Sequence, residues 1–277
     1  RGCMNKINKS KFSLPSKPNE TFLVFDLEAD GLYDQASVVH CIVIYDVFKQ
    51  QTFSYGPDAI GDALSHLATA DALIGHNIIF YDLPVLQKLH SFVCKSCIID
   101  TLICTRLIWP KEVLYELDSE QYPQVPEKNR GTASLKSWGL RLADHKISFK
   151  DFKEYSQEML DYCIQDVYIT YKLWQKIVNE RYPKSAMQLE HDFALAINKQ
   201  IRAGVPFDLD AALDLVDDLR AKQTELETQL KEIFPPIKHE TVFVPKVNNA
   251  KRGYVKGEPF TKVTYQEFNR SEEHTSE

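Results

Sequence analysis

Two carboxylates stand at the end of a short apolar run, in which four of the five residues from Phe22 to Asp26 are apolar. Such a run predicts a strand buried on both faces of a sheet. Asp26 and Glu28 are two residues apart, and alternation along a strand directs both to the same face. Like charges at the end of a buried strand need neutralisation, and hard cations such as Mg²⁺ prefer carboxylate oxygens. The pair therefore suggests a metal site, although an acidic turn completed by Asp30 and Gly31 is a simpler interpretation of it alone.

A second polar stretch contains Asn77 and Asp82 and follows a short buried strand expected near residues 72–75. Ligands of α/β proteins bind outside the carboxyl ends of such strands. Asp82 also begins a helix expected over residues 82–90, where an acidic residue stabilises the N-terminus without any further role. Asp82 alone therefore does not identify a site.

A third stretch places Tyr162 and Asp166 four residues apart on a long helix expected over residues 157–179, hence on one face. We expect that face to lie away from the buried stripe and toward the crevice. A solvent-facing pair is the alternative. The residues predicted to form the buried stripe are Leu160, Ile164, Val167, Tyr171, Trp174 and Val178.

The elements that would position these residues indicate an α/β domain with a mixed sheet. Strands over 38–45 and 51–55 form a meander with the first strand, and short strands near 72–75 and 97–100 alternate with helices. Residues 110–131 are polar and contain prolines, which predicts a loop or flap. After residue 183 the strand signals stop. Two helices, 185–203 and 208–234, then predict a separate helical segment.

Composition is that of a soluble globular protein, with 44% hydrophobic and 26% charged residues among 277. No apolar run approaches the roughly 20 residues of a membrane helix, and residues 1–20 contain no secretory signal, so we expect a cytoplasmic protein without membrane contact. The six cysteines are expected to be reduced, with Cys94 and Cys97 as unrelated thiols, because no second pair completes a zinc site.

The net charge of −6 is unusual for a protein that grips duplex DNA but suits an acidic metal pocket. Lys246, Lys251, Arg252 and Lys256 form a basic patch. On charge alone this patch is interpreted as a solvated loop.

Taken in order, D-x-E, N-x-x-x-[FY]-D and Y-x-x-x-D resemble the DEDD exonuclease superfamily. Tyr162, four residues before Asp166, marks the DEDDy branch, since the other branch would carry His at position 161 and this chain carries Asp. Residues 21–269 further resemble the proofreading domain and thumb base of bacteriophage family-A DNA polymerases. This wider resemblance is carried by His40-Cys41, His76-Asn77, Tyr81-Asp82-x-Pro84, Ile99-Asp100-Thr101-Leu102, Trp138-Gly139-x-Arg141-Leu142, Gln165-Asp166-Val167 and Arg202-Ala-Gly204-Val-Pro206-Phe207-Asp208.

The resemblance implies a ribonuclease H-like five-stranded sheet flanked by helices, followed by a small all-helical thumb base. The domains it implies are an N-terminal tail (1–20), a 3′–5′ exonuclease (21–183) and a truncated thumb (184–269). Separately, residues 270–277 resemble the translation of an adapter oligonucleotide and are expected to be a foreign tail, with an ordinary disordered polar tail as the alternative. The resemblance to the polymerases also implies a cytoplasmic location in the host cell if a phage encodes the protein.

The activity implied is two-metal hydrolysis, with Mg²⁺ or Mn²⁺, at the single-stranded 3′ end of a DNA primer strand. Asp26, Glu28 and Asp166 would hold one ion, and Asp26 with Asp82 the other. Tyr162 would orient the attacking water. Leu32 would wedge against the terminal base, and Asn77 would contact the terminal nucleotide.

Departures from the family leave alternatives open. The palm and fingers of the polymerase are absent, and residues 235–262 are short for the insert that holds thioredoxin in some phage enzymes, so a processivity partner is not implied. A DEDDy exoribonuclease of the ribonuclease D type is one alternative. A catalytically inactive nucleic-acid-binding module is the other.

Overall fold

The structure is a computed structural model that describes residue 12, residues 20–143, residue 149 and residues 151–266 of the chain. The chain divides into two compact units between Gly204 and Val205, later than the boundary predicted near residue 183. The predicted foreign tail and nearly all of the N-terminal tail lie outside the described residues.

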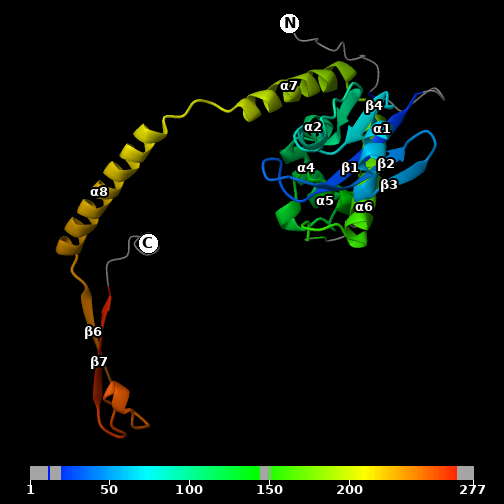
Figure 1. Cartoon of the computed structure of the whole chain (residues 1–277). Helices are drawn as coiled ribbons and strands as arrows, with labels where there is room; N and C mark the ends of the chain where they lie inside the picture. Colours follow the sequence, from blue (N-terminus) through cyan, green and yellow to red (C-terminus); the bar gives the residue numbers. More distant parts are fainter. Residues whose placement is uncertain (1–11, 13–19, 144–148, 150, 267–277) are drawn as a thin grey trace. The chain divides into compact units, whose positions relative to one another are not determined.

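A mixed five-stranded sheet forms the centre of the first unit, with strand order β3-β2-β1-β4-β5 (Figure 1). The central strand, β1, pairs antiparallel with β2 and parallel with β4. This sheet, which has helices on both faces, confirms the predicted mixed five-stranded sheet flanked by helices. The strands are β1 (Phe22–Ala29), β2 (Val39–Asp46), β3 (Gln51–Tyr55), β4 (Ala72–Gly75) and β5 (Cys97–Asp100).

Apolar side chains cover both faces of the sheet. Phe22 and Val24 of β1 pack into a core with α3, α5 and α6, whereas Leu23, Phe25 and Leu27 pack into a second core with α1 and α2. Because strand side chains alternate, Asp26 and Glu28 continue the series of Phe22 and Val24 and lie on the face covered by α6. The helices named here are α1 (Ile60–Leu67), α2 (Asp82–His90), α3 (Thr101–Ile108), α5 (Leu135–Arg141) and α6 (Gln157–Asn179).

The loop predicted over residues 110–131 is wrong for its first half, which forms α4 (Lys111–Glu120), while η2 (Glu127–Asn129) is a single 3-10 turn. A fully buried ion pair fixes α4: Arg141 donates from Nε to Asp118 Oδ1 and from Nη2 to Asp118 Oδ2, both at 2.7 Å. The backbone N–H of Gly131 also donates to Asp118, at 2.9 Å. The apolar pattern is weak here because a buried carboxylate occupies a position where an apolar residue would signal a helix.

Helix α7 (Lys184–Ala203) belongs to the first unit because its side chains bond to the sheet and to the loop after β4. His191, 2% exposed, accepts at Nε2 from the backbone N–H of Asp100 at 2.8 Å, and its Nδ1 donates to the carbonyl of Met187. Asn198 donates to the carbonyl of Ile79 and Arg202 to that of Phe80, at 2.9 and 2.8 Å.

The second unit consists of α8 (Leu209–Ile233), a single-turn 3-10 helix η3 (Ala250–Arg252) and a hairpin of β6 (Ile237–Phe243) and β7 (Phe260–Gln266), shown in orange and red in Figure 1. The expectation of an all-helical segment is therefore wrong. Both strand sequences are rich in β-branched and aromatic residues, which favour strands. In the described part of the chain, no helix has the length and apolar character needed to cross a membrane.

Candidate metal centre

Three potential metal-binding side chains converge where β1 meets α6. One ligand atom each from Asp26, Glu28 and Cys163 lies within 4.8 Å of the others. The Cys163 thiol donates to the backbone carbonyl of Asp26 at 3.5 Å and approaches its Oδ2 at 3.8 Å. Cys41 stands opposite Glu28 in the β1–β2 register and hydrogen bonds with Cys163. The two carboxylates of the D-x-E motif are thus gathered, and a thiol that belongs to none of the three motifs stands beside them.

Asp166 lies one turn beyond Cys163 on α6 and is only 4% exposed. The prediction that Asp166 lies on a face of α6 away from the buried residues is wrong. The side of α6 that packs against β1 is rotated by about one residue from the predicted stripe, and it includes Asp166. Leu160, Ile164, Tyr171 and Val178 of the predicted stripe are only partly buried. Val167 and Trp174 of that stripe are buried as predicted. The buried residues of α6 are Met159, Cys163, Asp166, Val167, Ile169, Thr170, Leu173, Trp174 and Ile177.

Asp82, the first residue of α2, is buried to 3% exposure, and its Oδ1 has no hydrogen-bond partner. Burial, with a contribution from the charge of Asp100, raises the pKa of Asp82 to about 7. A hydrogen bond from the backbone of Leu27 acts in the opposite direction. This carboxyl therefore lies near the backbone of Leu27 in β1. A buried carboxylate oxygen without a donor is suited to a cation, so the residues fit a divalent ion at this place.

Tyr81 is a further side chain among these carboxylates. Its hydroxyl donates to the carbonyl of Gly31 at 2.7 Å. Burial and then the negative charges of Asp82, Glu28 and Asp26 raise its pKa. From sequence, Tyr81 is only the aromatic position of the second motif. In the structure it ties the start of α2 to the turn after β1.

Leu32 projects from that turn and is 75% exposed. The turn itself is held in place: Lys88 of α2 donates to the carbonyls of Tyr33 and Ala36, at 2.7 and 2.9 Å. Asp30 accepts from the hydroxyl and backbone N–H of Ser37, and these bonds lower its pKa to about 2. An exposed apolar side chain on a fixed turn is consistent with the predicted wedge.

Asn77 adopts a left-handed backbone conformation with φ of 69°. Asp100 of β5 holds it there, accepting from the backbone N–H groups of Asn77 at 2.9 Å and Ile79 at 3.0 Å. The preceding Gly75 is required by close packing, because a Cβ would come within 2.2 Å of Ile78 and 3.0 Å of the Phe25 carbonyl. The loop that carries Asn77 is therefore rigid.

Tyr162 packs between two aromatic side chains that precede α6. Its ring centroid lies 5.9 Å from that of Phe149 and 6.1 Å from that of Phe152. His40 of β2 hydrogen bonds through Nε2 to the carbonyl of Phe152 at 3.0 Å. This segment therefore fixes the tyrosine beside the face of β2.

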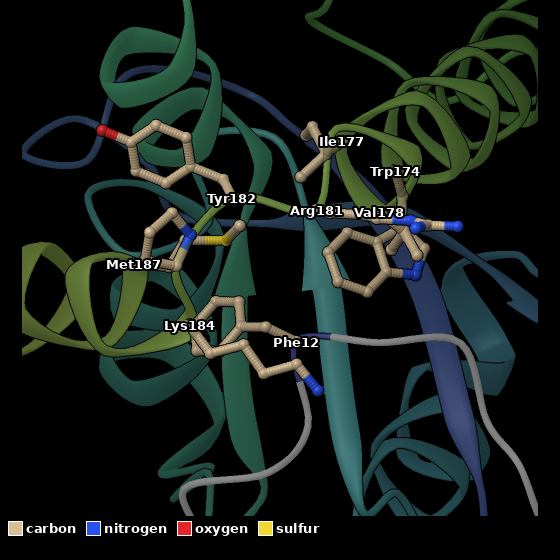
Figure 2. A pocket seen from close by; sticks show the side chains of 9 residues that line it. Phe12, Trp174, Ile177, Val178, Arg181, Tyr182, Lys184 and Met187 are labelled. Atoms are coloured by element: carbon tan, nitrogen blue, oxygen red, sulfur yellow. The ribbon is translucent and has the colours of Figure 1, made fainter.

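A separate pocket of about 400 Å³ lies between the end of α6 and the start of α7 and contains none of the predicted site residues (Figure 2). Phe12 lines it and stacks edge-on with His191 at 5.0 Å. Its other lining residues are Trp174, Ile177, Val178, Arg181, Tyr182, Pro183, Lys184 and Met187. The expectation of reduced cysteines holds for the described ones, since Cys41, Cys94, Cys97, Cys104 and Cys163 are free.

Comparison with known proteins finds two phage DNA polymerases. The chain is 28% identical over 337 aligned positions to the DNA-directed DNA polymerase of Escherichia phage T7, covering 90% of this chain and 48% of that protein. The DNA-directed DNA polymerase of Enterobacteria phage T3 matches with the same identity and coverage. The chain spans about half the length of these relatives. The predicted similarity to phage DNA polymerases is confirmed, and no family model matches the chain.

Among solved structures, the zinc-bound E. coli ExoI–ssDNA complex aligns with a TM-score of 0.39 and 15% identity, covering 60% of this chain and 41% of that one. Brucella melitensis NrnC bound to pGG aligns with a TM-score of 0.42 and 16% identity, covering 71% and 94% of the two chains.

Proposed function

We propose that this chain is a metal-dependent 3′–5′ exonuclease that removes nucleotides from single-stranded DNA 3′ ends, as the proofreading part of a DNA polymerase. The observation that carries the proposal is the convergence of Asp26 and Glu28 at the end of β1. The buried and partly unpaired carboxyl of Asp82 at the start of α2 supports it. The similarity to two phage DNA polymerases supports DNA as the substrate.

Asp26, Glu28, Asp82 and Asp166 would together hold two divalent ions, Mg²⁺ or Mn²⁺. When bound, such ions neutralise clustered carboxylates and supply Lewis acidity for hydrolysis of a phosphodiester. Carboxylates on three separate elements, β1, α2 and α6, would form this donor set. The rigid sheet and the packed α6 hold these donors in place before substrate arrives, which is the arrangement that electrostatic catalysis needs.

The other predicted residues would bind and orient. A tyrosine hydroxyl keeps its proton near neutral pH, with an ordinary pKa of about 10. Tyr162 is therefore assigned to orient the attacking water by a hydrogen bond rather than to remove its proton. Leu32 would stack against the terminal base, and Asn77 would contact the terminal nucleotide.

Proofreading follows from selection for an unpaired strand. A mismatched primer end separates from its template more readily than a paired end, because less pairing energy is lost. A site that accepts only the separated strand therefore meets mismatched ends more often than matched ones. The corresponding experiment compares cleavage of paired and mismatched 3′ ends.

The test is digestion of 5′-labelled single-stranded DNA by purified protein with Mg²⁺ or Mn²⁺. We expect stepwise shortening from the 3′ end, and a loss of at least about 10³-fold in rate for Asp26→Ala, the order of magnitude that a metal-held charge contributes. Asp161→Ala is the matched control, because Asp161 lies on the exposed side of α6, where it accepts a hydrogen bond from Gln157 of the same helix.

Three outcomes would overturn the proposal. Strong preference for a matched RNA oligonucleotide would favour the ribonuclease D-type alternative. Intact DNA after incubation with folded protein and either metal would favour the inactive binding module. Equal loss in Asp26→Ala and Asp161→Ala would show that the D-x-E pair does not carry the reaction.

A further inference from the structure

A thiol lies among the carboxylates of the candidate metal centre and belongs to none of the three sequence motifs. Cys163 of α6 is fully buried, and its Sγ lies within 4.8 Å of a carboxylate oxygen of Asp26 and of one of Glu28. The distance from this sulfur to Asp26 Oδ2 is 3.8 Å. The two carboxylate oxygens are also within 4.8 Å of each other, so three potential ligand atoms share one small space.

These separations are close to those found around a metal ion. Zinc lies about 2.3 Å from a thiolate sulfur and about 2.0 to 2.2 Å from a carboxylate oxygen, in tetrahedral geometry. Two ligand atoms on such an ion are therefore about 3.5 Å apart. Side-chain movements of about 1 Å or less would bring the three atoms to that spacing, which is within the range of a small rotamer adjustment.

The sulfur of Cys163 is held in place by both neighbouring strands. Its thiol donates to the backbone carbonyl of Asp26 in β1 at 3.5 Å. On the other side it hydrogen bonds with Cys41 of β2, which is fully buried and stands opposite Glu28 in the β1–β2 register. The thiol therefore occupies its position beside the carboxylate pair before any ion binds.

The centre is accessible to an ion and suited to one. Asp26 is partly exposed, and the buried Asp82 Oδ1, which has no hydrogen-bond partner, belongs to a carboxyl near the backbone of Leu27. Carboxylate oxygens alone favour hard ions such as Mg²⁺, whereas a thiolate favours softer ions such as Zn²⁺ and Cd²⁺. A donor set of two carboxylates and one thiol therefore favours softer ions more than an all-oxygen set does.

We propose that Cys163 is a further metal ligand of this centre and that, with Asp26 and Glu28, it binds a thiophilic divalent ion such as Zn²⁺ or Cd²⁺. On binding, a sulfur–metal bond replaces the S–H bond, and the proton passes to solvent. The inference rests on the proposed function in that it concerns the same centre. It makes the choice between Mg²⁺ and a thiophilic ion depend on a residue outside the three motifs.

The experiment titrates the full chain with Cd²⁺ in the absence of DNA and follows the ultraviolet charge-transfer band that forms when a thiolate binds this ion. The test variants are Cys163→Ala and Cys163→Ser, of which the second keeps the size of the side chain. The matched control is Cys104→Ala, because Cys104 of α3 is also a free and fully buried thiol. Cys94→Ser removes a thiol that is partly exposed, and Asp26→Asn tests whether a carboxylate shares the ion with the sulfur. Circular dichroism shows whether each variant is folded.

In both Cys163 variants we expect the band to disappear and the affinity for Cd²⁺ to fall at least about tenfold, since loss of even a residue that supports a ligand costs about 10- to 100-fold in metal affinity. Asp26→Asn should also weaken Cd²⁺ binding. Cys104→Ala and Cys94→Ser should bind Cd²⁺ as the unaltered chain does. The affinity for Mg²⁺ should not change in the Cys163 variants, because Mg²⁺ takes oxygen ligands.

Absence of the band from the unaltered chain, its survival in the Cys163 variants, or an equal loss in Cys104→Ala or Cys94→Ser would overturn the inference. Unchanged Cd²⁺ affinity in Asp26→Asn would do the same, since the thiol would then bind the ion without the carboxylate. Because the readout is metal binding without DNA, the two proposals fail separately. A Cys163-dependent band without DNA cleavage would refute the nuclease function alone, whereas cleavage with Mg²⁺ but no band would refute the thiol ligand alone.

Discussion

Asp82 is a carboxyl that the protein removes from water while leaving one oxygen without a donor. Its raised pKa, about 7 against an ordinary 3.8, means that the folded state binds the proton more tightly than the unfolded state. Without metal, its contribution to stability must therefore become less favourable as pH rises from about 4 to 7. A neutral amide at this position would carry no such penalty.

We accordingly predict that the free energy of unfolding of Asp82→Asn, in EDTA at pH 8, equals that of the unaltered protein or exceeds it by up to about 4 kcal/mol. With Mg²⁺ the order should reverse, because a bound ion stabilises only the protein that can hold it. Chemical denaturation with and without chelator makes the measurement. A variant less stable than the unaltered protein in EDTA would mean that Asp82 is satisfied without a cation.

Tyr162 and Asp26 should differ in how much activity they carry. Orientation of a water by one hydroxyl contributes less than the charge that holds a cation, so we expect Tyr162→Phe to slow cleavage by about 10- to 100-fold. Asp26→Ala should abolish it. Initial rates on single-stranded DNA under the same conditions provide the comparison, and equal losses would mean that Tyr162 is misassigned.

The individual motif residues could be predicted from the sequence because their spacing matches the periods of strand and helix. Cys163 could not be predicted, since a cysteine in an apolar segment is indistinguishable from a core residue until the facing strand is known. Only the β1–β2 register, which sets Glu28 opposite Cys41, and the packing of α6 show that this thiol contacts Asp26.

In helix α6, buried polar residues obscure the apolar periodicity of the helix. Its true buried line includes Cys163, Asp166 and Thr170, which are poor hydrophobic signals, so the apolar residues suggested a stripe displaced by one position. Helix α4 was missed for a related reason, because the buried Asp118 carries a salt bridge where an apolar residue would have marked the helix. A buried polar residue does not contribute to the hydrophobic periodicity from which a buried helix face is predicted.

The contact between α7 and β5 through His191 leads us to predict how the stability of the protein depends on pH. Burial lowers the pKa of His191 to about 4, from an ordinary 6.5. Between about pH 6.5 and pH 4 the unfolded state therefore binds a proton that the folded state does not bind. The contribution of His191 to the free energy of unfolding is fully present above about pH 6.5 and is lost as pH falls toward 4. A shift of this size corresponds to about 3 kcal/mol.

The measurement is the difference in unfolding free energy between the unaltered protein and His191→Gln, taken at several pH values in denaturant. At pH 7 the unaltered protein should be the more stable, because Nε2 accepts from Asp100. The gap should narrow by about 3 kcal/mol by pH 4. A gap independent of pH would show that His191 is not held neutral.

For the molecule as a whole, sequence indicated the sheet and its flanking helices because the strands are strongly apolar and the helices amphipathic. The second unit was harder. Helix α8 has a periodic apolar pattern yet no buried residue, and the hairpin strands have no core face to give them alternation. An apolar pattern indicates that a segment packs against another element but not which one. The second unit buries little of its apolar surface within the described chain, so the pattern gave little information about its fold.

The boundary between the two units at Gly204 leaves all the proposed catalytic residues in the first unit. The side chains that gather the carboxylates, and the α7 contacts through His191, Asn198 and Arg202, all lie before it. We therefore expect a protein ending at Gly204 to fold cooperatively and to cleave short single-stranded DNA at a rate within about threefold of the whole chain, since no proposed catalytic group is removed. Loss of the folded state on truncation, seen by circular dichroism, would mean that the second unit stabilises the first, whereas a folded but inactive protein would place a required group beyond Gly204.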